Sequence, residues 1–238
     1  MGHLFTKKFK LNNPFKPDEQ ITQEVQVNTT PQIDYSQVEW VAIDTEFIDL
    51  RMAYSQLCVV QIASPSAEQD RQNIEVIWVW ESQHSMLSEI QEKLSSIFER
   101  EDIQILMHFA GADLPRIEKL VGKRVSGQVF DTKTAARIIM SNTDRHGLKD
   151  LITGLIDPKY QKDKQVTASN WDLNPITWED KMVDYAMRDV LYLKPIEQIL
   201  IDLAKRRGSL ELVNEIMRTI PAISQLHKHD LEAKVLDH

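Results

Sequence analysis

Two pairs of polar residues, far apart in the sequence, have spacings that place their side chains together. Asp44 and Glu46 close an apolar run that begins at Val41, and Tyr185 and Asp189 lie four apart in a segment with helical periodicity. Side chains at i and i+2 of a strand point to the same face, and those at i and i+4 of a helix are neighbours. An apolar strand gains nothing in packing from two like charges on one face. A bound cation would explain them, because oxygen-rich clusters suit Mg²⁺ or Mn²⁺.

Taken separately, each pair is more often part of a solvated surface. An Asp-x-Glu is commonly a strand end, and a Tyr-x-x-x-Asp is commonly a surface pair on a helix. The interpretation as a site therefore depends on a third segment, which runs from His108 to Asp113. This segment follows a short apolar stretch and places Asp113 near the start of a helix, where an acid can also serve only as a cap. The three segments together supply four carboxylates.

Length and composition describe a globular chain of 238 residues, of which 42% are hydrophobic and 27% charged. No stretch approaches the ~20 apolar residues of a membrane span. The net charge of −8 argues against a broad DNA-coating surface, but not against an enzyme that works on one strand end. The single Cys58 cannot form an internal disulfide. It predicts a reducing compartment, and we expect a cytoplasmic protein.

The first 37 residues are polar, contain Pro14, Pro17 and Pro31, and show no sustained periodicity. Lysines precede the first acid without an arginine or a long apolar core, which argues against a transit or secretory peptide. We expect residues 1–37 to be a flexible, extended basic arm. One domain over residues 38–220 and a C-terminal tail over residues 221–238 would follow.

Hydrophobic periodicity predicts three strands, then a helix, then alternating strands and helices. Strands are expected over residues 38–44, 57–63, 74–80, 104–107 and 129–130. Helices are expected over residues 85–100, 112–121, 132–141 and 209–220, and another is expected to begin at residue 146. A long helix is expected from a cap at Thr177 to about residues 205–207, with a kink at Pro195. This order predicts an α/β domain with a mixed sheet, whose first strands form an antiparallel meander. The pair at residues 44 and 46 falls at the end of its first strand.

Read together, the motifs resemble the DEDD exonuclease superfamily in its tyrosine-containing (DEDDy) branch, and in particular the catalytic domain of ribonuclease D. The segments that carry the resemblance are Asp44-Thr45-Glu46-Phe47 with Tyr54-Ser55-Gln56-Leu57 and Gln61-Ile62, His108 through Asp113, Phe130-Asp131-Thr132, Asp163–Trp171, and Tyr185-Ala186 with Asp189-Val190 and Tyr192-Leu193. It extends from about residue 38 to 220. It implies a ribonuclease H-like mixed β-sheet flanked by helices, the fold of DnaQ-like 3′-5′ exonucleases.

The sequence departs from the family pattern in two places. Thr167 and Asn170 stand where the family commonly has glutamine and aspartate, and Met187 and Arg188 replace small residues. These departures affect how a strand would be held and leave the carboxylates in place.

Hydrolysis of a phosphodiester by two metal ions, Mg²⁺ or Mn²⁺, gives each acidic motif a role. We expect Asp44 to be shared by both ions, Glu46 and Asp189 to bind the ion that holds the water, and Asp113 to bind the second. Tyr185, one helical turn before Asp189, would orient the attacking water. Its hydroxyl is a poor base by itself, because its ordinary pKa is about 10.

Substrate contacts are expected from six residues: Thr45, Phe47, Leu50, His108, Lys164 and Trp171. Several of these have an equally ordinary structural explanation. Leu50 could pack in the core, Lys164 could lie in a solvated loop, and Trp171 is more often a packing anchor. His108 and His146 are more often structural, and Asp131 is expected to cap a helix.

We therefore expect a 3′-5′ exoribonuclease that binds single-stranded RNA 3′ ends and releases nucleoside 5′-monophosphates, without a membrane partner. Single-stranded DNA is an alternative substrate. A second alternative is a non-catalytic RNA-binding or scaffold protein of the same fold, which the retention of all four acids and the tyrosine disfavours.

Overall fold

The structure, a computed structural model, describes residues 2–49, 55–68, 70–80, 86–161, 170–229 and 231. Its strands are β1 (His3–Asn13), β2 (Lys16–Asn28), β3 (Trp40–Ile48), β4 (Gln56–Pro65), β5 (Gln72–Trp78), β6 (Gln104–Met107) and β7 (Gln128–Asp131). Its helices are α1 (Leu87–Phe98), α2 (Ala110–Val121), α3 (Thr132–Ile139), α4 (Leu148–Leu155), the 3₁₀ turn η2 (Pro175–Thr177), α5 (Asp180–Leu191), α6 (Leu193–Arg207), α7 (Leu210–Met217) and α8 (Ile220–Lys228). No helix in these ranges is long and apolar enough to cross a membrane.

The described strands form one seven-stranded mixed sheet in the order β1-β2-β5-β4-β3-β6-β7. β3, β4 and β5 pair antiparallel, which confirms the predicted meander. β6 and β7 extend the sheet parallel to β3. β3 pairs with β6 over residues 40–42 and with β4 through residues 44 and 46, so β4 holds the backbone of these two residues in place.

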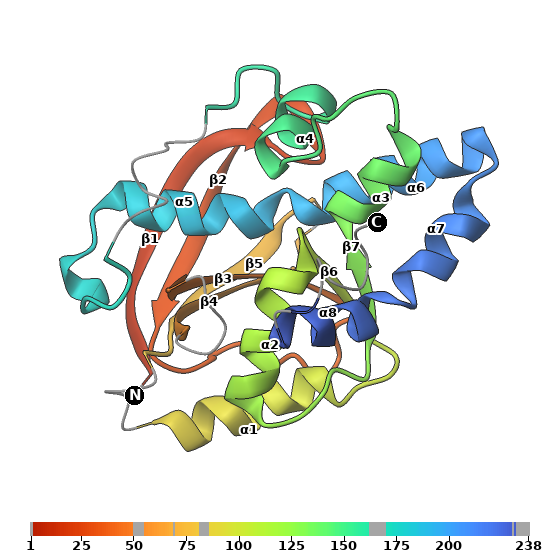
Figure 1. The fold of residues 1–238 in the computed structure, drawn as a ribbon. Coiled ribbons are helices and arrows are strands. Elements are labelled where there is room, and N and C mark those ends of the chain that lie inside the picture. Colours follow the sequence, from red (N-terminus) through yellow and green to blue (C-terminus); the bar gives the residue numbers. More distant parts are fainter. Residues whose placement is uncertain are drawn as a thin grey trace.

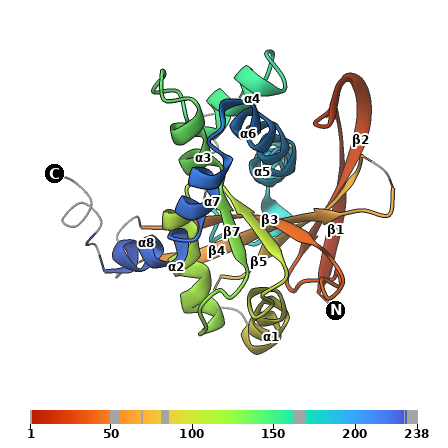
Figure 2. The same cartoon turned by 90° about the vertical axis from the view of Figure 1, so that its right-hand side faces the viewer.

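Helices cover both faces of this sheet. α5 crosses β3, β4 and β5 on one face, whereas α1 and α2 lie on the opposite face (Figures 1 and 2). α8 packs against α2 and crosses it, so the last described helix returns to the body of the domain (Figure 1). The β1–β2 hairpin forms one edge of the sheet (Figure 2), and α5 contacts both of its strands.

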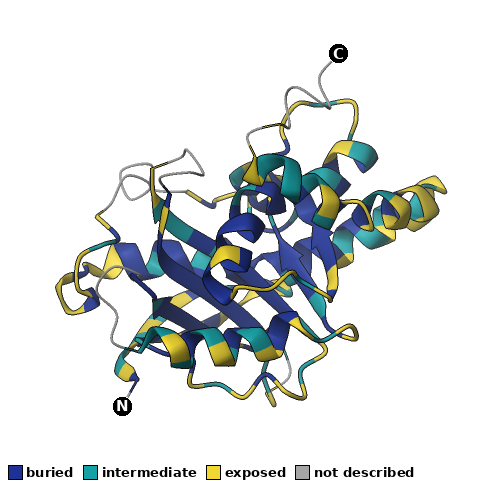
Figure 3. Cartoon of the chain, turned by 60° about the horizontal axis from the view of Figure 1, so that its bottom comes forward, coloured by how far each residue is buried: buried dark blue, intermediate teal, exposed yellow. Residues whose placement is uncertain are grey.

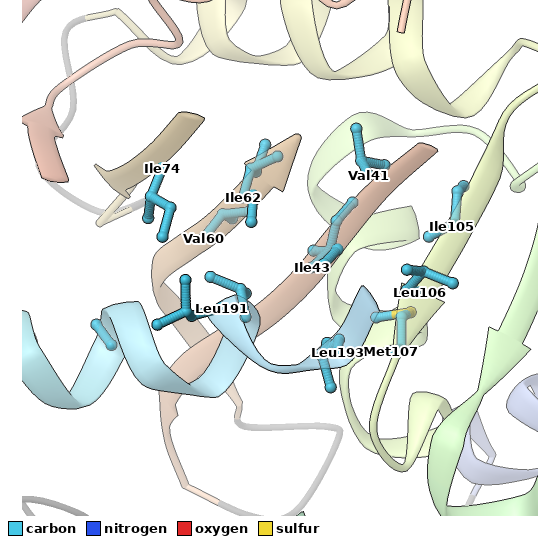
Figure 4. Packing of buried hydrophobic residues seen from close by; sticks show 14 of the residues in the cluster. Val41, Ile43, Val60, Ile62, Ile74, Ile105, Leu106, Met107, Leu191 and Leu193 are labelled. Atoms are coloured by element: carbon cyan, nitrogen blue, oxygen red, sulfur yellow. The ribbon is translucent and has the colours of Figure 1, made fainter. Parts of the chain in front are cut away.

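The core is formed by the apolar strands and the inner faces of the helices, and exposed residues lie on the outer faces (Figure 3). Val41 and Ile62 point from the sheet to one side and Ile74 to the other, as strand alternation requires (Figure 4). Leu191 and Leu193, where α5 meets α6, are fully buried beside these strands. From residue 57 to 63, β4 is apolar except for Gln61, because the sheet is covered on both faces there.

The prediction of a flexible arm is wrong for residues 3–28. These residues form the β1–β2 hairpin, whose turn contains Pro14, and β2 joins the sheet beside β5. Ile21, Val25 and Val27 alternate along β2 and are buried. The prolines predict breaks here, whereas Pro14 lies in the turn and Pro17 is the second residue of β2.

The predicted long helix is divided into α5 and α6 at Tyr192. Pro195 has no N–H to donate to the carbonyl of Leu191, and its ring would clash with that carbonyl in a continuous helix. The carbonyl of Leu191 accepts instead from Nε2 of Gln72, at 2.8 Å. Thr177 does not cap this helix, because it ends the 3₁₀ turn and Glu179 precedes α5.

The predicted last helix ends early, and another helix follows it. α7 ends at Met217, and residues 220–228, which the sequence assigned mostly to a tail, form α8. Pro221 lies in the first turn of α8, where a missing N–H costs nothing.

Candidate active site

Three of the predicted carboxylates converge at one place. Asp44 and Glu46 project from one face of β3, and Asp189 comes from α5, which packs against that strand. One oxygen of each side chain lies within 4.8 Å of the oxygens of the other two. Asp189 is buried, and the other two are half-buried. Like charges this close repel one another unless a cation or a proton balances them, so the donor set fits a divalent metal ion.

Tyr185 lies one turn before Asp189 on α5 and is 8% exposed. Its ring packs against Trp171, with the ring centroids 6.2 Å apart. Trp171 in turn forms a T-shaped pair with Trp178, at 5.3 Å between ring centroids. These aromatic contacts hold the tyrosine ring and so orient its hydroxyl.

The fourth carboxylate, Asp113, comes from α2 and is not one of the three convergent groups. The hydroxyl of Thr45 donates a hydrogen bond to its Oδ1. Burial raises the pKa of Asp113 to about 7, and the charges of Asp131 and Asp189 act in the same direction. The Thr45 hydrogen bond and the charge of Arg116 oppose this rise. The influence of Asp189 links this carboxyl electrostatically to the group on β3 and α5.

Asp131 caps two helices, which confirms its predicted role as a cap. Its Oδ1 accepts from the backbone N–H of Lys133 at 2.9 Å and of Thr134 at 3.1 Å, at the start of α3. The backbone N–H of Phe109 donates to Oδ1 at 3.1 Å, and that of Ala110 donates to Oδ2 at 2.9 Å. Phe109 has a left-handed backbone with φ of 65°. Asp131 thus holds the unusual turn that begins α2, the helix that carries the fourth carboxylate.

The two histidines make structural hydrogen bonds. Nδ1 of His108 lies 2.9 Å from Oγ1 of Thr132, and that hydroxyl donates to the carbonyl of Met107 at 3.1 Å. Nδ1 is therefore the donor to Thr132, and His108 ties the end of β6 to α3. Nε2 of His146 donates to the carbonyl of Met140 at 3.0 Å.

Arg116 is a candidate site residue that the sequence did not predict. It is 6% exposed, its Nε donates to the hydroxyl of Ser55 at 2.7 Å, and its guanidinium lies 3.5 Å from the ring centroid of Phe47. It lies one turn after Asp113 and lowers the pKa of that carboxyl. The signal in the sequence was the Asp-x-x-Arg spacing on one helix face.

The predicted substrate contacts have different outcomes. Trp171 is 2% exposed and packs against Trp178 and Tyr185, which is the arrangement of a packing anchor, and its contact with substrate stays a prediction. Thr45 is buried with its hydroxyl on Asp113, and one face of Phe47 is covered by Arg116. Leu50 and Lys164 lie outside the described residues.

Comparison with known proteins decides the family. A family model described as 3′-5′ exonuclease matches residues 19–204. The chain belongs to this exonuclease family. It is 28% identical over 166 residues to the ribonuclease D of Jannaschia sp. (strain CCS1), covering 68% of this chain and 38% of that protein. It is 26% identical over 194 residues to the ribonuclease D of Sphingobium indicum, covering 82% and 46%. The chain thus spans less than half the length of these two curated relatives.

Solved structures with the same fold include NrnC of Brucella melitensis bound to pGG, which is 28% identical. Its TM-score is 0.71, and the match covers 89% of this chain and 96% of that one. NrnC with bound Mg²⁺ matches at 27% identity with the same TM-score of 0.71 and covers the same shares, 89% and 96%. Escherichia coli RNase D matches at 22% identity and a TM-score of 0.60, covering 80% and 46%. The predicted ribonuclease H-like exonuclease fold is therefore confirmed.

Proposed function

We propose that this chain is a 3′-5′ exoribonuclease that removes nucleotides one at a time from a single-stranded RNA end and releases nucleoside 5′-monophosphates. The observation that carries the proposal is the convergence of Asp44, Glu46 and Asp189 within 4.8 Å, on a chain of the 3′-5′ exonuclease family. The ribonuclease D relatives favour RNA as the substrate.

The chain's own residues would act as metal ligands and as groups that orient water. Asp44, Glu46 and Asp189 would hold one divalent ion, and Asp113, whose pKa the charge of Asp189 raises, would complete the site for a second. Bound Mg²⁺ or Mn²⁺ supplies the stabilisation of negative charge on the phosphate and the activation of water. The hydroxyl of Tyr185 would orient the attacking water, since its ring is fixed by Trp171.

Short oligonucleotides are a second candidate class of substrate. The chain matches 96% of NrnC, whose structure contains pGG, but only 38–46% of the two ribonuclease D relatives. The match over nearly the whole length of NrnC supports pGG as a test substrate alongside longer RNA.

The test uses purified protein and RNA labelled at its 5′ end, with Mg²⁺ or Mn²⁺ and with EDTA as the control. We expect a ladder that shortens in single-nucleotide steps and is absent in EDTA. A 3′-phosphate should stop or greatly slow the ladder, and a circular strand should resist cleavage. Rapid cutting of the circle would mean an endonuclease. Comparison with labelled DNA and pGG then ranks the substrate classes.

A further inference from the structure

The side chain of Gln61 is buried beside the carboxylates without any hydrogen bond. Gln61 lies on β4, is 0% exposed, and neither Oε1 nor Nε2 has a partner among the described residues. Two other buried glutamines, Gln23 and Gln72, also have an unpaired Oε1, but in both Nε2 donates to a backbone carbonyl. A buried amide that makes neither bond lowers the free energy of unfolding, so its presence needs an explanation.

The sheet register places this amide next to a proposed metal ligand. Gln61 is the direct antiparallel partner of Asp44, and its other neighbour, on β5, is the apolar Val76. Side chains of directly opposed residues share a face of the sheet, with Cβ atoms ~4.5–5.5 Å apart. The same face is covered by α5, which carries Asp189. Gln61 thus lies in the layer between the sheet and this helix, beside the carboxylates.

Gln61 and Asp44 can form a hydrogen bond in one direction only, from the amide to the carboxylate. An ionised aspartate accepts hydrogen bonds and cannot donate, whereas the Nε2 of glutamine donates two. Carboxylates that bind metal ions are commonly held by donors behind them, and these donors set ligand orientation. Val76, on the other side of Gln61, has no polar group in its side chain. Asp44 is therefore the polar neighbour that the register gives to this amide.

We propose that Gln61 is a positioning residue, which fixes the carboxylate of Asp44 by donating from Nε2 when the site is loaded. Because Gln61 is fully buried, it acts through Asp44 and does not touch RNA. This inference rests on the proposed metal role of Asp44. It also implies that Gln61 lowers the free energy of unfolding of the metal-free protein.

The test compares Gln61→Met with wild type, and uses Gln23→Met as a matched control. Methionine is close in shape and lacks the amide, and Gln23 is a buried glutamine on β2 whose Nε2 is bonded to the carbonyl of Gln72 at 2.9 Å. The full-length chain is used for each protein. Two quantities are measured: Tm in EDTA, and the affinity for Mn²⁺ from the electron paramagnetic resonance signal of the free ion.

For Gln61→Met we expect an unchanged or higher Tm in EDTA, together with Mn²⁺ affinity roughly 10–100-fold weaker, the usual effect of removing such a donor. For Gln23→Met we expect a lower Tm and unchanged Mn²⁺ affinity. A merely structural glutamine would give the second pattern at position 61. Unchanged Mn²⁺ affinity in Gln61→Met, weaker affinity accompanied by a lower Tm, or no Mn²⁺ binding by wild type would each overturn the inference.

Nuclease assays on the same proteins separate this inference from the proposed function. If wild type binds Mn²⁺ and Gln61→Met weakens that binding without lowering Tm in EDTA, the inference stands even when no RNA is cleaved. In that case only the exonuclease proposal fails. If RNA is cleaved but Gln61→Met binds Mn²⁺ as wild type does, the exonuclease proposal stands and the inference fails.

Discussion

Thr45 on β3 donates its hydroxyl hydrogen bond to Asp113 on α2, and so joins the first acidic motif to the second through a single contact. Both side chains are 5% exposed. Thr45 points to the opposite face of β3 from its neighbours at 44 and 46, as strand alternation requires. Two carboxylates thus lie on one face of β3, where α5 adds Asp189, and Thr45 contacts Asp113 from the opposite face.

Thr45→Val should therefore destabilise the protein more at high pH than at low pH. The hydroxyl stabilises the ionised form of Asp113, so its loss raises a folded-state pKa that already lies at about 7. When the folded-state pKa of an acid is raised, the protein loses stability as pH rises from the unfolded-state pKa to the folded-state pKa. A further rise in the folded-state pKa of Asp113 therefore adds a loss of stability at high pH. We expect a loss of about 1–3 kcal/mol at high pH and a smaller loss at low pH. The two losses are measured by urea unfolding in EDTA at about pH 5.5 and about pH 8.5, on either side of this pKa.

Thr45→Ser is the control for this prediction, because serine keeps the hydroxyl. It should behave like wild type apart from the loss of one methyl group. An equal loss for Thr45→Val at both pH values would mean that the hydroxyl does not interact with an ionised Asp113.

Asp189→Asn should abolish nuclease activity while leaving the fold intact. It removes one of three convergent charges without changing the volume of the core. We expect hydrolysis to fall by roughly 10²–10³-fold or more, the scale on which single groups that stabilise transition-state charge act. Tm in EDTA should not fall, because repulsion is relieved. Asp180→Asn, on the same helix but in an exposed ion pair with Lys7, is the control and should retain activity. Retained activity in Asp189→Asn would remove this residue from the proposed ligands.

Tyr185→Phe should slow turnover much more than it weakens RNA binding. The ring and its contact with Trp171 remain, and only the hydroxyl is lost. A kcat lower by roughly 10²-fold or more, with little change in Kd for uncleaved RNA, is expected. Tyr160→Phe removes a hydroxyl from a buried ring that packs on Tyr192, outside the carboxylate group, and serves as control. Unchanged kcat with weaker binding would instead make Tyr185 a packing or stacking residue.

Glu75 holds the segment after the hairpin to the sheet. Its Oε1 accepts from Nδ2 of Asn28 and the backbone N–H of Gln32, each at 2.6 Å, and its Oε2 accepts from the hydroxyl of Tyr35 at 2.5 Å. Glu75→Leu should destabilise the protein by roughly 1–3 kcal/mol for each donor left buried. Glu75→Gln should cost much less, since it keeps the oxygen that accepts from Asn28 and Gln32.

The carboxyl of Glu75 makes the stability of wild type depend on pH, whereas the amide in Glu75→Gln does not titrate. Burial raises the pKa of Glu75, and its hydrogen bonds oppose that rise only in part. The contribution of Glu75 to stability is therefore fully present below its ordinary pKa and decreases as pH rises through the raised value. Urea unfolding across this range should show the decrease in wild type and not in Glu75→Gln. Identical pH profiles would mean that Glu75 titrates normally.

The sequence was sufficient for the meander and the acidic motifs because both depend on local patterns. Apolar runs predicted β3, β4 and β5, and the i, i+2 spacing predicted that Asp44 and Glu46 share a face. The hairpin needed information that no local pattern contains, namely that β2 pairs with β5, a strand about 50 residues away. The roles of Gln61 and Arg116 also depend on register and on packing between elements, which periodicity does not give.

The close approach of Gly111 on α2 to His227 on α8 gives a last prediction. A Cβ at position 111 would lie 2.2 Å from Nε2 of His227, so the His227 ring would have to move to admit an alanine there. His227 also contacts the ring of Phe109 edge-on, at 5.6 Å between centroids. Gly111→Ala should therefore displace the His227 ring and lower Tm in wild type. In a His227→Ala background the same substitution should raise stability by up to about 1 kcal/mol, because alanine favours a helix over glycine by that amount. The change of sign between the two backgrounds, measured by urea unfolding of the four proteins, tests the contact directly. Equal effects in both backgrounds would show that α8 does not pack on α2 through His227.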